Sequence, residues 1–112
     1  MIVDDYGGFR AAARKLLEAG DYRVVGEAED GESAVAAVEE LRPDVVLLDV
    51  LLPDTNGFEI ADRFAAQARV VLVSSRERGA FRRQLEESSA CGFVYKGDFS
   101  LRALDAVLDR CA

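Results

Sequence analysis

Five polar side chains stand at the ends of short apolar runs: Asp4, Asp5, Asp49, Ser74 and Lys96. Carboxylates that lie close together repel one another unless a cation sits among them. Oxygen ligands without nitrogen or sulfur select a hard ion, and Mg²⁺ is the natural occupant. Such an ion, an ammonium and a hydroxyl can neutralise three phosphoryl oxygens while a carboxylate attacks the phosphorus. The five residues therefore indicate phosphoryl-transfer chemistry if the fold brings them together.

Asp49 is the most unusual of these residues, because the stretch VVLLDVLLPDTNGFE at 45–59 surrounds it with apolar side chains. Burial of an unpaired carboxylate costs several kcal/mol, so Asp49 is expected where a buried strand reaches solvent. A single Asp, Ser or Lys at a strand end is more typical of a turn or a surface. The interpretation depends on four strand ends supplying complementary groups.

The elements that position these residues alternate between two hydrophobic periods. Short runs rich in β-formers predict five strands, at residues 1–3, 22–28, 45–50, 69–75 and 92–96. The helical period predicts five helices, at residues 9–17, 34–41, 57–65, 80–88 and 101–108. Because no hairpin dipeptide joins two strands, right-handed βαβ crossovers are expected. The sequence therefore predicts a doubly wound α/β fold with a parallel sheet covered on both faces.

Three residues are expected to mark helix ends. Asn56 and Ser100 are suited to cap the helices that follow them, with Glu59 reaching back toward Asn56, and Gly20 suits a helix C-terminus. In open parallel sheets, ligands bind outside the carboxyl ends of the strands. The polar residues at the strand ends should therefore meet at one edge of the sheet.

Composition bounds the class of protein. The 112 residues are half apolar, which suits one compact domain, and the net charge of −7 argues against direct binding of nucleic acid by this chain. The longest apolar runs are far shorter than the roughly 20 residues of a membrane helix. No export signal is recognisable, so a cytoplasmic location is expected.

Cysteine and histidine usage excludes further chemistry. The chain has no histidine, which excludes Ser-His and Cys-His catalysis and a zinc site of ordinary ligand spacing. Cys91 and Cys111 are expected to be two reduced, mostly packed thiols.

Four stretches together resemble the receiver domain of bacterial two-component response regulators: IVDD at 2–5, VVLLDVLLPDTNGFE at 45–59, VVLVSS at 70–75 and GFVYK at 92–96. The resemblance covers essentially the whole chain and is greatest to receivers joined to a C-terminal helix-turn-helix DNA-binding domain. It implies a flavodoxin-like fold with strand order 2-1-3-4-5. It also implies that residues 1–112 are the receiver domain, and that an output domain is absent from this sequence.

The resemblance assigns roles to the carboxylates. Asp49 would accept a phosphoryl group from a sensor histidine kinase. Asp5 and Asp49 would bind Mg²⁺ directly, Asp4 would assist through water, and the backbone carbonyl of Leu51 would be a further ligand.

The resemblance also implies a switch. Ser74 lies at the position of the family's switch hydroxyl, Lys96 at that of its lysine, and Phe93 at that of an aromatic ring that turns inward when the hydroxyl moves. The surface of the fourth helix, fifth strand and fifth helix would then change, control transcription and support a homodimer. Such a protein assists its own phosphorylation and dephosphorylation without being a classical enzyme. The alternative for Phe93 is an ordinary edge-strand aromatic packed on a helix.

The sequence departs from the family pattern in several places. Gly97 follows Lys96 where the family usually has proline, which leaves that loop freer. The first strand and the segment 64–69 are short, and residues 74–80 are expected to be mobile and to displace the start of the fourth helix. Asp54 is expected to be a solvated loop residue.

Three alternatives remain open. A magnesium-dependent phosphatase with an aspartyl nucleophile typically has a second Asp two residues later, where this chain has Leu51. A flavin or dinucleotide module would need more than the Gly7-Gly8 pair after the first strand. An atypical receiver would keep the fold as an interaction or ligand-binding module without control by phosphorylation.

Overall fold

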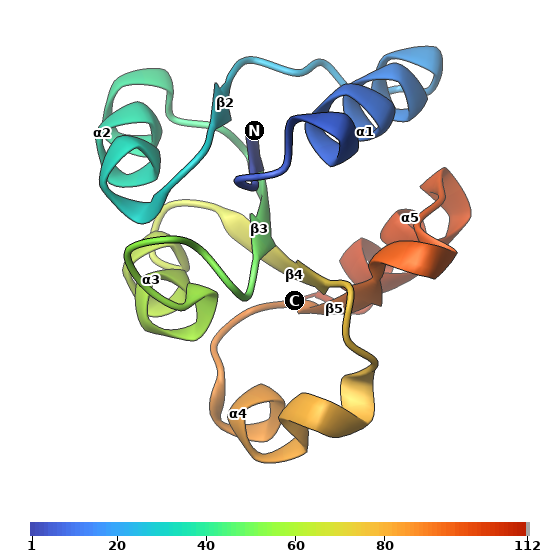
Figure 1. Ribbon diagram of the computed structural model, residues 1–112. Coiled ribbons are helices and arrows are strands. Elements are labelled where there is room, and N and C mark those ends of the chain that lie inside the picture. The colour runs from blue at the N-terminus through green and yellow to red at the C-terminus, as the bar shows by residue number, and fades with distance from the viewer. Residues whose placement is uncertain (112) are drawn as a thin grey trace.

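The computed structural model describes residues 1–111 as a parallel sheet between two layers of helices (Figure 1). The five strands are β1 (Ile2–Val3), β2 (Glu27–Ala28), β3 (Val45–Asp49), β4 (Arg69–Ser74) and β5 (Gly92–Tyr95). All neighbouring strands are parallel, and their order is β2-β1-β3-β4-β5. The predicted doubly wound fold and its strand order are confirmed.

Helices cover both faces of the sheet. They are α1 (Gly7–Ala19), α2 (Gly31–Leu41), α3 (Gly57–Phe64), α4 (Arg82–Glu87) and α5 (Leu101–Asp109), with 3₁₀ turns η1 (Arg78–Phe81) and η2 (Lys96–Asp98). Helices α1 and α5 pack on one face, and α2, α3 and α4 on the other (Figure 1). Among the described residues, no helix has the length and apolar character needed to cross a membrane.

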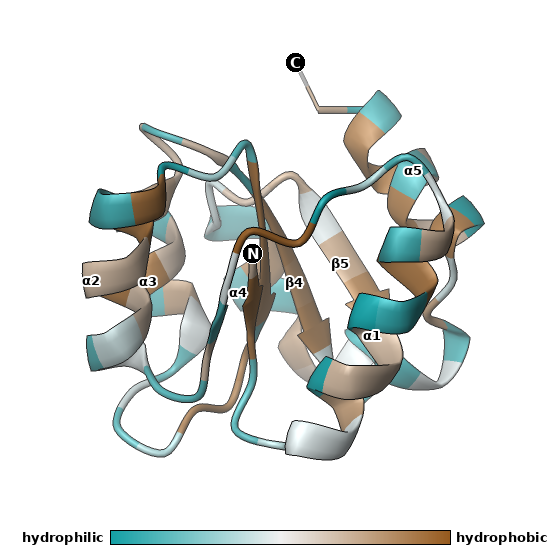
Figure 2. Cartoon of the chain, turned by 90° about the horizontal axis from the view of Figure 1, so that it is seen from above, coloured by the Kyte–Doolittle hydropathy of each residue, from teal (hydrophilic) through white to brown (hydrophobic). Residues whose placement is uncertain are grey.

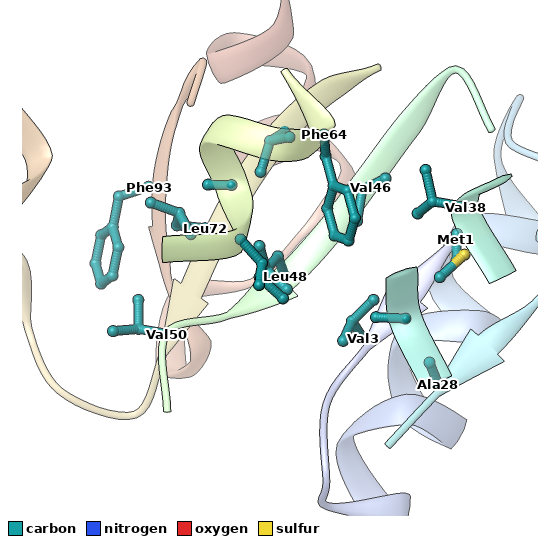
Figure 3. Packing of buried hydrophobic residues seen from close by; sticks show 14 of the residues in the cluster. Met1, Val3, Ala28, Val38, Val46, Leu48, Val50, Phe64, Leu72 and Phe93 are labelled. Carbon is teal, nitrogen blue, oxygen red and sulfur yellow. The ribbon is translucent and has the colours of Figure 1, made fainter. Parts of the chain in front are cut away.

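Successive strand residues point to opposite faces, which gives the molecule two cores. In β3, Val46 and Leu48 face α2 and α3, whereas Leu47 faces α1 and α5. Figure 3 shows the first core, in which Leu48, Leu72 and Phe64 pack together. The strands are therefore hydrophobic on both faces, and Figure 2 shows them between helices whose outer residues are hydrophilic.

The predicted caps are present. The side chain of Asn56 accepts a hydrogen bond from the Glu59 N–H at 3.0 Å, and the Ser100 hydroxyl accepts one from the Ala103 N–H at 3.0 Å. Gly20 follows α1 as its C-cap. The expectation that Glu59 reaches back to Asn56 is wrong, because its carboxylate accepts from the Thr55 hydroxyl at 3.1 Å.

Strand β2 and helix α4 are clearly shorter than predicted. Residues 22–26 do not join β2, because its partner β1 pairs only from Ile2, opposite Glu27, onward. The fourth helix begins with the 3₁₀ turn η1, and α4 itself has six residues. Residues 75–80 are exposed.

The prediction of two reduced thiols is wrong. Cys91 and Cys111 form a disulfide, with their Cα atoms 5.1 Å apart. A separation of 20 residues gives no signal for pairing in the sequence, because only the return of α5 along β5 brings the two cysteines together.

Candidate functional site

The polar residues at the strand ends meet at the carboxyl edge of the sheet. Asp4 follows β1, Asp49 ends β3, Ser74 ends β4 and Lys96 follows β5. Ligand oxygens of Asp4, Asp5 and Asp49 all lie within 4.8 Å of one another. The parallel register of separate strands therefore builds an acidic cluster from residues that are up to 45 positions apart in the sequence.

Asp4 is fully buried in this cluster. Its Oδ1 accepts a hydrogen bond from the Tyr6 N–H at 2.9 Å. Its Oδ2 makes no well-directed hydrogen bond, and the Lys96 ammonium lies 2.6 Å from it. A buried carboxylate oxygen with one cation beside it retains capacity for a further ligand.

Asp49 is 5% exposed and is held from two sides. Its Oδ1 accepts from the Leu51 N–H at 3.2 Å, and its Oδ2 lies 3.4 Å from the Lys96 ammonium. Burial and, to a smaller extent, the negative charge of Asp4 raise the pKa of Asp49 to about 6, against the opposing effects of the Leu51 N–H and Lys96. The single ammonium of Lys96 therefore leaves the cluster with uncompensated negative charge.

The cluster fits a hard divalent cation. It offers only oxygen ligands, one of them the buried Asp4 Oδ2, and the exposed carboxylate of Asp5 borders the open side. Mg²⁺ prefers carboxylate oxygens and retains several waters, which an exposed side of the site permits. Asp4, Asp5 and Asp49 are therefore the residues that would hold it.

Ser74 lines the same pocket as Asp49 and Lys96, and Phe93 lies on the neighbouring strand β5. Ser74 is 1% exposed, and its hydroxyl accepts a hydrogen bond from the Arg76 N–H at 3.0 Å. Phe93 is also buried, with its ring centroid 6.1 Å from that of Phe81 and the Arg78 guanidinium 5.7 Å from its own centroid. The ring of Phe93 thus points inward, and Figure 3 shows it among the buried residues of the first core.

Sequence reasoning missed two residues that position this site. The Lys96 ammonium lies 4.7 Å from the ring centroid of Phe9, and the Arg10 guanidinium donates to the backbone carbonyl of Asp4 at 2.7 Å. Phe9 begins the helix predicted at residues 9–17, and no sequence signal distinguishes a ring that supports a lysine from one that fills a core.

Asp54 and Gly57 also have structural roles. Asp54 is exposed as expected, but its carboxylate accepts from the N–H groups of Gly31 and Glu32 at 2.8 and 3.0 Å and so caps α2. A Cβ on Gly57 would lie 2.4 Å from the backbone oxygen of Asp49. Gly57 therefore permits close approach of the loop to the end of β3.

Comparison with known proteins gives a consistent result. Residues 1–109 match the family model described as "Response regulator receiver domain". The chain is 34% identical over 116 aligned positions to the probable transcriptional regulatory protein NarL of Mycobacterium tuberculosis, and 32% identical over 99 to the DNA-binding transcriptional activator EvgA of Escherichia coli. These alignments cover 100% and 86% of this chain but 53% and 48% of the relatives. The chain thus spans about half the length of these curated regulators.

Solved structures agree with these matches. The signal receiver domain of the putative response regulator NarL from M. tuberculosis superposes with a TM-score of 0.85 at 33% identity, covering 96% of this chain and 90% of that one. The response regulator domain of Thermotoga maritima CheB gives a TM-score of 0.81 at 28% identity, covering 98% and 92%.

Proposed function

The chain belongs to the family of response regulator receiver domains, and we propose that Asp49 accepts a phosphoryl group to control an output function. One observation carries this proposal: a buried, charge-strained carboxylate at the end of β3 lies in a cluster with two further carboxylates and one ammonium. That arrangement costs stability by itself and becomes useful when a divalent cation and a phosphoryl group enter it.

Each residue has a defined part in the proposed reaction. An Asp49 carboxylate oxygen forms a bond to phosphorus while the bond from phosphorus to the nitrogen of a histidine kinase phosphohistidine breaks. Asp5, Asp49 and the Leu51 carbonyl would hold Mg²⁺, with Asp4 assisting through water, and the bound ion would neutralise phosphoryl charge. The Lys96 ammonium moves from the carboxylates to a phosphoryl oxygen, and the Ser74 hydroxyl donates to another.

The proposed signal passes through Ser74 and Phe93. When the Ser74 hydroxyl turns toward the phosphoryl group, it gives up the hydrogen bond from Arg76, and the segment that follows β4 is freed to move. Phe93 packs on Phe81 of that same segment, so its contacts must adjust with it. The surface of α4, β5 and α5 is the expected readout.

The relatives suggest what this surface controls. NarL and EvgA are named as transcription regulators, so we assign this chain, residues 1–112, as the receiver half of a cytoplasmic transcription regulator. DNA would be contacted by an output domain outside this sequence, since the acidic receiver is a poor ligand for phosphate backbones. A sensor histidine kinase is the upstream partner, and a homodimer through α4, β5 and α5 is the expected active form.

Incubation with acetyl phosphate and Mg²⁺, followed by intact mass spectrometry, tests the proposal. Wild-type protein should gain one phosphoryl group, and the gain should disappear in EDTA because the three carboxylates then lack their counter-ion. Asp49→Asn should not be labelled. Asp44→Asn is the matched control. Asp44 lies at the opposite end of β3, so this variant protein should still be labelled at Asp49.

Two results would contradict the proposal. Absence of labelling, under conditions that label another receiver, would favour an interaction module that does not depend on phosphorylation. Labelling that persists in Asp49→Asn would show that a different residue is the acceptor.

A further inference from the structure

The Cys91–Cys111 disulfide lies at the opposite edge of the sheet from the acidic cluster. Cys91 immediately precedes β5, whereas Lys96 immediately follows it. Cys111 lies two residues beyond the end of α5, and the cross-link closes β5, η2 and α5 into one loop. The unit that carries Lys96 at one end therefore carries a covalent tie at the other.

The tie holds only the last turn of α5. Leu104, Val107 and Leu108 are buried against the sheet, and a Cβ on Gly92 would lie 2.8 Å from the Val107 side chain, so this part of the helix is closely packed without the disulfide. Beyond it, Arg110 is exposed and Cys111 is half-buried. Cleavage of the disulfide should therefore release the helix end and leave the core in place.

We infer that Cys91 and Cys111 form a reversible redox site that fixes or frees the end of α5. Both cysteines are half-buried, so small thiols and disulfides can reach the pair from solvent. Their Cα separation of 5.1 Å lies in the ordinary range for a disulfide, so the folded chain holds them ready to pair. The inference rests on the proposed function only in naming the α5 surface as the readout.

The chemistry is thiol–disulfide exchange with a low-molecular-weight disulfide such as glutathione disulfide. One cysteine thiolate attacks a sulfur of that disulfide and releases one glutathione thiolate. The second cysteine thiolate attacks the mixed disulfide and releases the other. The two protein thiols are oxidised to one disulfide, glutathione disulfide is reduced to two thiols, and the two cysteine protons pass to those products. Excess thiol reverses both steps.

The cross-link should have a measurable effect on stability and on local opening. Closing a loop of this length restricts the unfolded chain enough to raise Tm by about 10 °C in the oxidised protein. In the reduced protein, amide exchange should accelerate at Arg110 and Cys111, whose N–H groups bond to carbonyls of the last helical turn, and should stay unchanged at Leu104.

The test equilibrates the folded chain in glutathione buffers of increasing oxidised fraction and counts alkylated thiols by mass. Wild-type protein should pass from two alkylated thiols to none, return on addition of dithiothreitol without denaturant, and show the Tm shift between the two states. Cys91→Ser and Cys111→Ser are matched controls, and their Tm should not respond to the formation or reduction of disulfides.

Three outcomes would overturn the inference: full alkylation in excess glutathione disulfide, a disulfide between two chains, or a disulfide that resists reduction in the folded protein. Acetyl phosphate labelling of both redox states separates this result from the proposed function. Failure to label Asp49 would leave a reversible disulfide standing, and a failed disulfide would leave labelling of Asp49 intact.

Discussion

At the scale of the residue, the site is defined by charge that its surroundings do not fully compensate. Asp4 and Asp49 are buried, and within residues 1–111 Lys96 is the only cation whose ionic contacts reach both. In the metal-free protein, this uncompensated charge should lower the free energy of unfolding near neutral pH. Variants that remove one of the charges should show the effect.

The pH dependence of stability should identify Asp49. Its pKa is raised from 3.8 to about 6, so the folded chain binds this proton more tightly than the unfolded chain does. The resulting stabilisation is present below pH 4 and is lost as pH rises through about 6, by about 3 kcal/mol in total. In urea unfolding with EDTA, the free energy of unfolding of Asp49→Asn should rise relative to that of wild type by about 3 kcal/mol between pH 4 and pH 7. If the difference in free energy of unfolding between the variant and wild type stayed constant with pH, the raised pKa of Asp49 would be wrong.

Lys96 should stabilise the metal-free protein. Removal of its ammonium leaves the buried carboxylates of Asp4 and Asp49 without a cationic partner, so Lys96→Met should lower the free energy of unfolding in EDTA by about 3 kcal/mol. The chain offers a matched control in its other lysine, Lys15, which is exposed on α1. Equal stabilities of Lys96→Met and Lys15→Met would show that the ion pairs do not matter.

At the scale of the element, most of the fold could be predicted because each segment has one dominant hydrophobic period. The apolar run of β3 and the Asn56 and Ser100 caps are local signals, and the structure confirms them. The failures depend on partners distant in sequence. Residues 22–26 lack a strand neighbour, and the pairing of Cys91 with Cys111 requires the completed β5–α5 unit.

The loop after β3 should be the element most sensitive to a small substitution. Gly57→Ala would place a Cβ 2.4 Å from the Asp49 backbone oxygen, so the loop must shift, at a cost of about 3 kcal/mol. Gly79→Ala is the matched control, because its Cβ would meet no atom within 4 Å. Thermal unfolding of both variants measures the difference. Equal stability of Gly57→Ala and Gly79→Ala would contradict the close approach of Gly57 to the Asp49 backbone oxygen.

At the scale of the whole molecule, the candidate site depends on sheet topology more than on any single motif. The types of Asp4, Asp5, Asp49, Ser74 and Lys96 could be recognised in the sequence, and the parallel strand order brings their strand ends to one edge. The sequence could not predict that Asp4 Oδ2 lacks a hydrogen bond or that the Phe9 ring lies beside Lys96. Both features follow from side-chain packing.

Metal binding should stabilise the folded chain as a whole. A ligand that binds only the folded state at about one hundred times its Kd adds about 2.7 kcal/mol to the free energy of unfolding. Mg²⁺ at that excess should therefore raise Tm relative to EDTA. Asp5→Asn should reduce the shift, since Asp5 supplies an exposed oxygen of the cluster. An equal Tm with and without Mg²⁺ in wild-type protein would argue against the site.

The account depends on one cation position at the carboxyl edge of the sheet, and Mn²⁺ can locate it. Mn²⁺ accepts the same oxygen ligands as Mg²⁺ and broadens nearby amide signals in NMR spectra. Sub-stoichiometric Mn²⁺ should first broaden the signals of Asp5, Asp49 and Lys96, whereas those of Asp44 and Cys91, at the opposite edge, should stay sharp. Broadening centred on that opposite edge, or spread evenly over the surface, would contradict the account.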